Sequence, residues 1–312
     1  PLRLARATRI NPLQLAEMLV ARMPNSSEVE RVAAALPGFV NFFLKNRWVQ
    51  QQVEVVREAG GEYGNVEVGH QRRIMVEFVS VNPTGPVHVG HTRGAVLGSA
   101  LANVLKAAGY DVTREYYVND AGNQMDIFYR SVYARYQQAL GYSIEFPANG
   151  YQGDYIQELA QEIIDAEGTR FLGMDEDQAI KQIGDLGREK MVANIRADLD
   201  LVGVNFDNWF SERSLFENQG YDRAMDRLRE KNYLSERENA LWFNSSQLGD
   251  DKDNVVVRST GEPTYFASDI AYHRNKFIER SFDSVVDIWG ADHQGHVARM
   301  KSAVTALGIE AG

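Results

Sequence analysis

The stretch from residue 74 to residue 118 constrains the fold of this chain more than any other. Residues 74–80 form a short run rich in β-branched and aromatic side chains, and its mostly apolar character is typical of a buried strand. Proline and glycine interrupt the run at 82–86, and apolar residues then recur at helical spacing through 90–108. Because residues 111–118 return to a strand pattern, the stretch predicts a parallel strand–helix–strand unit and the chain an α/β fold.

The joint between the first strand and the helix carries the residues with the clearest chemistry, His88-Val89-Gly90-His91. The exposed amides and positive end of a helix attract phosphate at such a place, and Gly90 leaves room for a flat ring such as adenine. His88 and His91 can both point at one anion, and imidazole N–H donors stabilise charge that develops during displacement at phosphorus. The alternative is a helix cap or a surface histidine, since so short a motif also occurs by chance.

The composition excludes several classes of protein. The chain has no cysteine, which rules out disulfides and thiolate metal sites, and no apolar run approaches the length of a membrane span. The N-terminus lacks a secretory signal pattern, so the protein is expected to be cytoplasmic and to have no membrane partner. Its 312 residues suffice for about two domains.

The formal net charge of −10 argues against binding nucleic acid through the overall field of the protein. The charge is uneven, because residues 1–60 carry eight Lys/Arg and five Glu, so that the remainder carries −13. This asymmetry permits a local RNA-facing surface near the N-terminus. A solvated surface with scattered arginines is the alternative.

Residues 1–65 predict the end of a small α+β domain. Helical patterns near the N-terminus are followed by a strand pattern at 38–44 and a further helix at 46–59 that ends at two glycines. Residues 60–69 are the expected linker. Pro1 is not an initiator methionine, which indicates a piece processed or cut from a longer chain.

The region from about 147 to 234 shows helical periods and no strand pattern. Its part from 151 to 200 is acidic, with twelve Asp/Glu against five Lys/Arg. We therefore predict a helical insertion between two halves of the sheet, with a mostly solvated surface. Short strand patterns resume at 236–243 and 254–259.

Further polar segments fall where ligands of open α/β folds bind, beyond the carboxyl ends of strands. Asn119, Asp120 and Gln124 directly follow the second strand of the organising stretch, although a turn with a helix cap explains them equally well. Tyr265 and Asp269 are four residues apart and share one face if this segment bends into a helix. Asp is also an ordinary residue of a first helical turn, so structure alone would account for it.

The last polar segment follows a buried strand pattern at 284–290. It contains Asp292, His293 and His296, and histidines at this spacing beside an aspartate resemble part of a metal site. No further ligand cluster accompanies them in the sequence. We therefore expect no structural metal.

Five segments in order carry a resemblance that is far more specific than His-x-Gly-His alone. They are LPGFVNFFL (36–44), EFVSVNPTGPVHVGH (77–91), YYVNDAGNQ (116–124), GDDKDNVVVRSTGEPTYFASDIAYH (249–273) and IWGADHQGH (288–296). Together they resemble arginyl-tRNA synthetase of the bacterial type, a class I aminoacyl-tRNA synthetase whose first signature is the His-x-Gly-His motif. The resemblance implies a Rossmann-like catalytic domain at 66–312, and at 1–65 part of the family's extra domain that touches the D-arm corner of tRNA.

The same resemblance assigns arginine-binding roles residue by residue. Ser80 and Asn82 match positions that hold the α-amino and carboxyl ends of the substrate arginine. Glu77, Tyr265 and Asp269 match positions that receive its guanidinium group. A planar cation with five donors suits carboxylates and a phenol, not an apolar pocket.

The ATP site follows in the same way. His88 and His91 match the ATP-binding histidines and are the expected catalytic pair, and His91 also lies close to the amino acid in the family. The other expected ATP-binding positions are Gly90, Gly290 and Asp292. In many relatives a glutamine stands at or next to His293. Because the neighbour here is Gln294, which of the two contacts arginine stays open.

The implied function is that of an arginine–tRNA ligase. Arginine and ATP, the latter with Mg²⁺, form arginyl-adenylate and pyrophosphate, and arginine then passes to tRNA(Arg), which the family generally needs for activation too. A monomer is expected. The sequence stops at Gly312 before the second class I signature and the helical anticodon-binding domain, so we expect a fragment with little activity of its own. The alternative is a non-catalytic remnant of a synthetase that binds arginine or tRNA.

Overall fold

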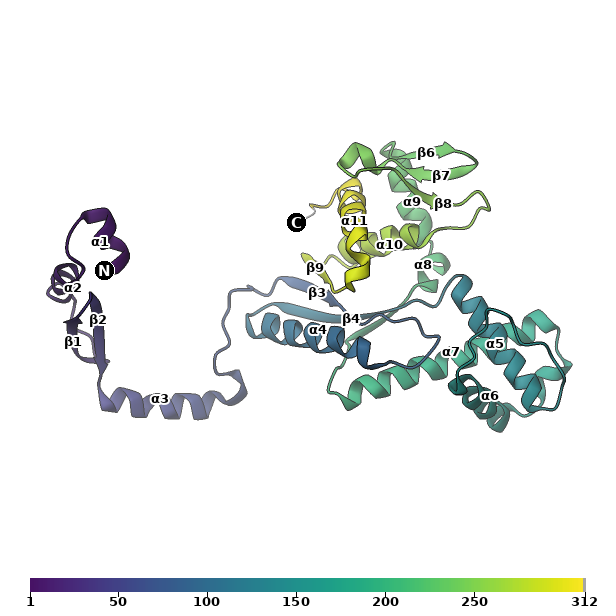
Figure 1. The fold of residues 1–312 in the computed structure, drawn as a ribbon, viewed down its shortest axis with the longest axis horizontal. Coiled ribbons are helices and arrows are strands. Elements are labelled where there is room, and N and C mark those ends of the chain that lie inside the picture. Colours follow the sequence, from purple (N-terminus) through teal and green to yellow (C-terminus); the bar gives the residue numbers. More distant parts are fainter. Residues whose placement is uncertain (311–312) are drawn as a thin grey trace. The chain divides into compact units, whose positions relative to one another are not determined.

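The computed structural model describes residues 1–310, apart from the side chain of Asp292 (Figure 1). It divides into two compact units, residues 1–65 and residues 66–312. Within residues 1–310, no helix is long and apolar enough to cross a membrane.

The first unit combines short helices with one β-hairpin. Its elements are α1 (Leu2–Thr8), α2 (Pro12–Val20), β1 (Val29–Ala35), β2 (Phe39–Leu44), α3 (Asn46–Ala59) and the 3₁₀ turn η1 (Gly60–Glu62). The side chain of Asn11 accepts a hydrogen bond from the Leu13 amide at 2.9 Å and so caps α2, whose first residue is a proline. β1 and β2 pair antiparallel, and the Arg31 guanidinium on β1 lies 3.4 Å from the centre of the Phe43 ring on β2.

A four-stranded parallel sheet organises the second unit. Its strands are β3 (Arg73–Glu77), β4 (Asp111–Val118), β5 (Asn208–Ser211) and β9 (Ser284–Asp287), in the order β5-β4-β3-β9. Helix α4 (Val89–Ala107) joins β3 to β4, which confirms the predicted parallel strand–helix–strand unit. β4 lies on one side of β3 and β9 on the other, so the strand order reverses at β3. Ligands of open α/β sheets bind at such a point.

Close packing between α4 and the sheet depends on a glycine. The Phe78 ring, fully buried just after β3, lies against Gly98 on α4, where an added Cβ atom would come within 2.1 Å of the ring. Any larger residue at position 98 would therefore push α4 away from the sheet. This contact therefore sets how closely α4 packs against the sheet.

Two details differ from the sequence prediction. β3 ends at Glu77, three residues early, because Val79 and Ser80 have left-handed backbone angles, with φ of 68° and 44°. A β-branched residue rarely adopts that conformation. The prediction of a strand-free insertion across 147–234 was also wrong at 208–211, which form the edge strand β5 beside β4. Four half-buried residues are too short a run to show a strand period.

The helices of the insertion pack with the preceding helix α5 (Asn123–Ala139) as one bundle beside the sheet (Figure 1). They are α6 (Asp154–Glu167) and α7 (Glu176–Leu201), with the 3₁₀ turn η2 (Arg170–Gly173) between them. The tyrosines of α5 belong to the core of this bundle, and Tyr136 is fully buried while its hydroxyl donates to the Gly168 carbonyl at 2.8 Å.

The rest of the unit forms a second apolar core around helices α10 and α11. Its helices are α8 (Arg213–Glu217), α9 (Gly220–Glu230), α10 (Tyr265–Arg274) and α11 (Gln294–Leu307), and α10 continues into the π-helical turn η4 (Asn275–Glu279). Its strands β6 (Leu234–Arg237), β7 (Ala240–Phe243) and β8 (Asn254–Val257) pair antiparallel. The 3₁₀ turns are η3 (Ser245–Leu248) and η5 (Ala291–His293). The predicted bend of residues 265–269 into a helix is confirmed as the start of α10.

Candidate active site

The two histidines of the His-x-Gly-His motif form one stacked pair at the start of α4. Their ring centres are 3.6 Å apart with an angle of 24° between the ring planes. His88 is the N-cap, and its Nδ1 accepts from the Gly90 amide at 3.1 Å, while the His91 Nδ1 accepts from the His88 amide at 3.3 Å. Because both Nδ1 atoms are acceptors, Nε2 carries the proton in each neutral ring. The pair thus offers two N–H donors beside a helix N-terminus.

Electrostatics favour the neutral form of His91. Partial burial and the neighbouring His88 ring both lower the pKa of His91. Gly90 serves the geometry, because a Cβ atom there would lie 2.9 Å from Cε1 of His88. The sequence predicted that Gly90 leaves room for a flat ring, and in this structure the ring beside it is that of His88.

A row of acidic residues crosses the sheet at one register. Glu115 on β4, Glu77 on β3 and Asp287 on β9 are Cα partners in neighbouring strands, so their side chains lie on the same face. We call these three residues the carboxylate row. Like charges at such a spacing repel each other, and the cations that separate them come from the segment after α10.

Lys276 separates Glu77 from Asp287. It lies in the π-helical turn η4 and is fully buried, and its ammonium donates to Oε2 of Glu77 at 2.6 Å and to Oδ1 of Asp287 at 2.7 Å. Burial raises the pKa of Glu77, while Lys276 lowers the pKa of Asp287. Arg280 serves Glu115 in the same way, with two hydrogen bonds of 2.7 and 2.5 Å.

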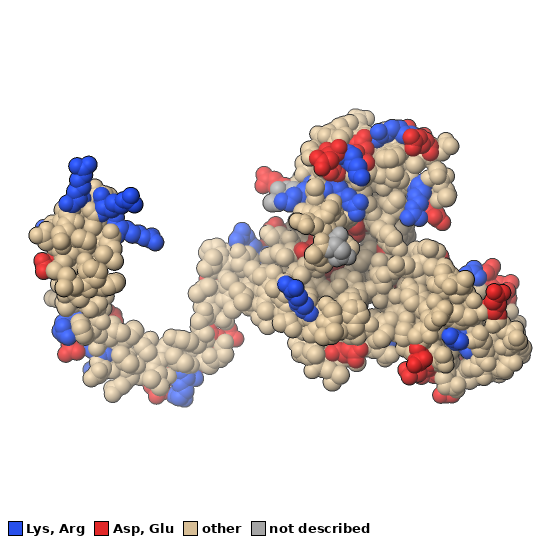
Figure 2. Space-filling model, in the orientation of Figure 1, with Lys and Arg blue, Asp and Glu red and all other residues tan. Residues whose placement is uncertain are grey.

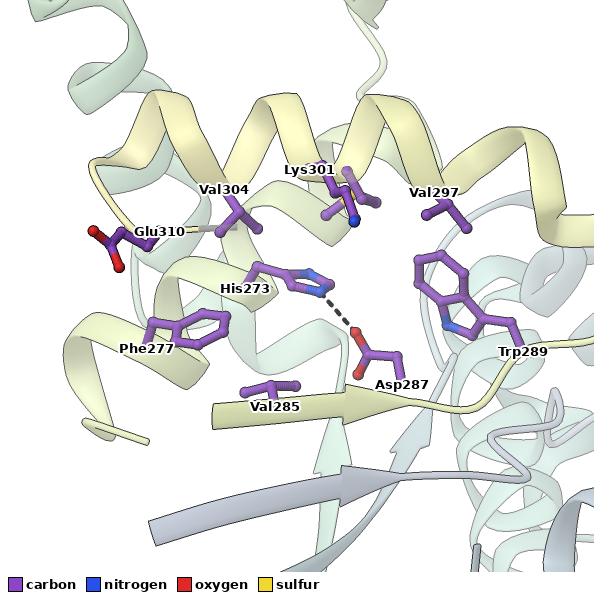
Figure 3. A pocket seen from close by; sticks show the side chains of 10 residues that line it. His273, Phe277, Val285, Asp287, Trp289, Val297, Lys301, Val304 and Glu310 are labelled. Carbon is purple, nitrogen blue, oxygen red and sulfur yellow. Dashed lines mark hydrogen bonds and ion pairs between the residues drawn. The ribbon is translucent and has the colours of Figure 1, made fainter. Parts of the chain in front are cut away.

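His273 also lies against the row. Its Nε2 lies 2.9 Å from Oδ2 of Asp287 and its Nδ1 lies 2.8 Å from the carbonyl oxygen of Asp269. Both ring nitrogens thus face oxygen atoms. Figure 3 shows the His273–Asp287 pair beside a cavity of about 240 Å³ between α11 and β9, which is also lined by Trp289 and Lys301.

Ser80 connects the carboxylate row with the backbone of β4. Its hydroxyl donates to Oε1 of Glu77 at 3.1 Å and accepts from the Tyr117 amide at 3.1 Å. The left-handed angles of Val79 and Ser80 bring this hydroxyl back over the end of β3. Residues held in such strained backbone conformations cluster at functional sites.

Asp269, on the first turns of α10, lies beside α11. Its Oδ2 is 2.9 Å from Nε2 of His296, whose Nδ1 accepts from Nε of Arg299. His296 therefore carries its proton on Nε2 and donates to Asp269 as a neutral ring. Tyr265, one helical turn earlier, is half exposed. Unlike the carboxylate row, Asp269 faces a neutral donor in place of a fixed cation.

Glu212 is a buried carboxylate that the sequence reasoning missed. It directly follows β5, and burial raises its pKa to about 7, with the charges of Asp269 and Asp120 adding to the effect. The hydroxyls of Ser268 and Tyr117 offset part of it. Its Oε2 is the one buried carboxylate oxygen without a hydrogen-bond partner among the described residues. We call Glu212 and Asp269 the pocket pair. Glu212 was not predicted as a site residue, because the strand that it follows, β5, was not predicted either.

The polar cluster after β4 divides into two parts. Asp120 is almost completely buried and accepts from Arg188, from the Ser211 hydroxyl and from the Arg213 amide, at 2.7 to 3.0 Å. This network ties α7 to the turn that carries Glu212, so Asp120 is committed to structure. The side-chain amide of Asn82 donates a hydrogen bond to Oε1 of Gln124. Asn119 is half-buried next to Asp120.

The remaining predicted residues lie in the loop after β9. Gly290 precedes the η5 turn, and His293 and Gln294 are exposed where α11 begins. The ring of His293 lies 6.2 Å from that of Trp289. Asp292 falls outside the described side chains. Among residues 1–310 as described, no group of three or more His, Cys, Asp or Glu could hold a metal ion.

Charged side chains are scattered over the visible face of the second unit, whereas arginines gather at α1 in the first unit (Figure 2). Arg3 and Arg6 lie on α1 and Arg9 follows it directly. None of the residues of α1 is buried. This is the basic surface that the charge asymmetry of the sequence permits.

Family models and curated proteins that are similar to this chain all belong to one family. Residues 52–310 match the family model "tRNA synthetases class I (R), catalytic domain", and residues 1–44 match "Arginyl tRNA synthetase N terminal domain". A curated arginine–tRNA ligase from Dehalococcoides mccartyi is 53% identical over 309 residues, 99% of this chain and 56% of that protein. One from Carboxydothermus hydrogenoformans is 47% identical over 307 residues, 98% of this chain and 55% of that protein. The chain thus spans about half the length of the curated relatives it matches.

Solved structures agree. One from Campylobacter jejuni, described as an arginyl-tRNA synthetase, has a TM-score of 0.77 at 35% identity and covers 86% of this chain and 58% of its own. The Thermus thermophilus arginyl-tRNA synthetase has a TM-score of 0.61 at 21% identity, covers 98% of this chain and 56% of its own, and supports the fold alone.

Proposed function

We propose that this chain, which belongs to the family of class I tRNA synthetases (R), builds the arginine pocket and one side of the ATP site of an arginine–tRNA ligase. The observation that carries the proposal is the pocket pair, two neighbouring carboxylates of which one is buried with an unpartnered oxygen. A buried carboxylate without a counter-ion is costly, and a cationic substrate removes that cost.

The pocket pair suits a guanidinium better than an ammonium. Asp269 and Glu212 come from different elements, and the Tyr265 hydroxyl lies one helical turn before Asp269. A planar fork with five donors can hydrogen-bond both carboxylates and the phenol at once, whereas an ammonium has three donors at a single point. Glu77, whose charge Lys276 compensates, is proposed to act through Ser80, and Ser80 and Asn82 are the proposed partners of the α-amino and carboxyl groups.

At the other end of the pocket, His88 and His91 are proposed to bind ATP. In the activation step the arginine carboxylate attacks the α-phosphorus, the bond to the β-phosphate oxygen breaks, and pyrophosphate leaves. The two Nε2–H donors would stabilise charge on the phosphate oxygens, helped by the amides of the first turn of α4. His91 acts as a neutral donor, since its pKa is lowered. ATP enters with Mg²⁺ as its counter-ion.

The second step transfers arginine to tRNA(Arg). The arginines of α1 support a tRNA-facing role for the first unit, because Lys and Arg contacts to phosphate supply much of the affinity for nucleic acid. Gly90, Gly290 and Asp292 are proposed for the ATP site, and Asn119, Gln124, His293 and Gln294 for its border with arginine.

We propose that the protein acts in the cytoplasm as a monomer.

Calorimetric titration of the chain with L-arginine and L-lysine tests the pocket. We expect selective binding of arginine, because lysine leaves part of the pocket pair without donors. Glu158→Ala, which removes an exposed acid of α6, is the control for a general loss of negative charge. Equal affinity for the two amino acids would exclude this assignment.

A second titration tests the ATP side. His91→Ala removes one N–H donor and the cap on the His88 amide, so ATP affinity should fall while arginine affinity changes less. His70→Ala, which removes an exposed histidine outside the motif, is the matched control. If His91→Ala left ATP binding unchanged, the stacked pair would be a structural cap only.

A further inference from the structure

Lys276 is a buried cation that the proposed reaction does not use directly. Its side chain is completely buried, and its ammonium touches a different partner on each side. Two of these are the carboxylates of Glu77 and Asp287, and the third is the ring of Tyr272, whose centre is 4.0 Å away. A buried ammonium so fully satisfied is a permanent component of the fold and cannot exchange with solvent or substrate.

The Lys276 ammonium determines which oxygen of Glu77 faces Ser80. Oε2 of Glu77 is held by Lys276, and this leaves Oε1 directed at the hydroxyl of Ser80. That hydroxyl in turn accepts from the Tyr117 amide. Two hydrogen bonds therefore connect the buried ammonium with Ser80 through the Glu77 carboxylate, and a third connects Ser80 with the Tyr117 amide.

We propose that Lys276 is a positioning residue of the arginine pocket, which holds the Glu77 carboxylate against Ser80 and favours its ionised form. The inference rests on the proposed function, because it assigns Lys276 an effect on arginine without contact to arginine. The role of Lys276 is more than structural, because the proposed substrate senses the charge of Glu77 and the orientation of the Ser80 hydroxyl.

A lysine is needed here because Glu77 and Asp287 are neighbours in the sheet register. Without a cation between them, two buried carboxylates at this spacing cannot both stay ionised, and one takes up a proton at neutral pH. A protonated Glu77 would offer the pocket a neutral acid, and its affinity for a guanidinium would depend on pH. Lys276 lowers the pKa of Glu77 against the effect of burial, so that its removal should move this dependence to higher pH.

Other titratable groups also face Glu77 or its neighbour, so the test compares variants with the unmodified chain at each pH. Around Glu77 they are Lys276, Asp287, Glu115 with its partner Arg280, His273, Tyr117 and Tyr272. On the far side of Asp287, Lys301 and Glu310 line the cavity of Figure 3. Groups that do not contact Lys276 or its two carboxylates titrate alike in all variants and cancel in the ratio, and Lys276→Arg, which keeps the cation, controls for the others.

The experiment is calorimetric titration of the full chain with L-arginine between pH 6 and pH 9. We expect Lys276→Met to weaken binding at least about tenfold at pH 7 relative to the unmodified chain, and the ratio to recover several-fold by pH 9 as Glu77 ionises. Lys276→Arg should restore much of the affinity, because it keeps a cation between the carboxylates. Lys181→Met, an exposed lysine of α7, should change nothing.

A loss of the same size at every pH would overturn the proposal, because it would show that Lys276 matters only for packing. If Lys276→Met does not fold, the pair Glu77→Gln and Glu77→Gln/Lys276→Met replaces it. A residue that acts only through Glu77 adds less than about threefold to the loss in the Glu77→Gln background. A further loss of tenfold there would also overturn the proposal.

These outcomes are separate from those of the proposed function. If the unmodified chain does not distinguish arginine from lysine, the pocket assignment itself fails. If it binds arginine selectively and Lys276→Met shows a pH-independent loss, only the role of Lys276 is wrong.

Discussion

Glu77 and Glu212 lie at the carboxyl edge of the same parallel sheet, one at the end of β3 and the other directly after β5. Burial raises the pKa of both glutamates to about 7. Their surroundings differ, because Glu77 belongs to the carboxylate row with its fixed partner Lys276, whereas one oxygen of Glu212 has no partner among the described residues. The row is compensated from within the protein, and the pocket pair is not.

This difference separates structure from function within a single cluster of charges. A buried ion pair is costly to break, because removal of one partner leaves the other uncompensated. A buried carboxylate without a partner destabilises the fold but is ready for a cationic ligand. Changes in the row should therefore affect stability first, and changes in the pocket pair should affect arginine binding first.

The largest effect should come from the row. Lys276→Met leaves Glu77 and Asp287 without their shared cation and should lower the free energy of unfolding by about 3–5 kcal/mol at pH 7. The deficit should shrink toward pH 5, because both carboxylates in the variant have raised pKa values and stability from such groups is lost as pH rises. Urea unfolding at the two pH values measures this. A deficit that does not depend on pH would point to lost packing alone.

Asp269→Ala tests the pocket pair. It removes a carboxylate that no fixed cation compensates, so arginine binding should weaken by about 2–4 kcal/mol, while unfolding should change far less than in Lys276→Met. Titration calorimetry and urea unfolding of the same preparation give both numbers. If the loss of stability exceeded the loss of binding, Asp269 would belong with the row, and the comparison would fail.

Glu212→Gln should move stability and binding in opposite directions. The folded-state pKa of Glu212 is raised, so the folded state favours the protonated carboxyl. The stability that this contributes is complete below the ordinary pKa of the group and is lost as pH rises toward about 7. A glutamine removes this penalty, and at pH 8 the free energy of unfolding should increase by about 1–3 kcal/mol. Arginine binding should weaken. Lower stability at pH 8 would show that Glu212 is compensated by a partner.

The smallest effect is expected where charges are paired but exposed. Arg57 and Glu54 form an ion pair of 2.8 Å on α3, and both side chains are more than half exposed. Arg57→Ala should change the free energy of unfolding by less than about 1 kcal/mol, and added salt should reduce even that. Thermal unfolding at low and high salt measures it. A large effect would mean that pairing matters more than burial in this protein.

Much of the fold was predictable because its signals are local. The buried strand 74–77, the Pro/Gly loop and the periodic helix α4 follow from side chains that are neighbours in the chain. The four-residue spacing of Tyr265 and Asp269 puts them on one face of a helix, and the structure supplies that helix as α10. Residues 208–211 were not predictable as a strand, because their only strand property is the partner β4. The left-handed turn at Val79 and Ser80 was equally hidden, since neither residue favours it.

The sequence alone determined the family, the position of the His-x-Gly-His motif at the start of a helix, and the polar residues that follow β3, β4 and β9. These depend on residue types and on their spacing along the chain. Only the tertiary structure decided which carboxylates are neutralised. Lys276 and Glu77 are 199 residues apart, and Glu212 approaches Asp269 only because β5 joins the sheet. Charge compensation acts through space over a few ångströms, so no pattern along the chain could tell the carboxylate row from the pocket pair.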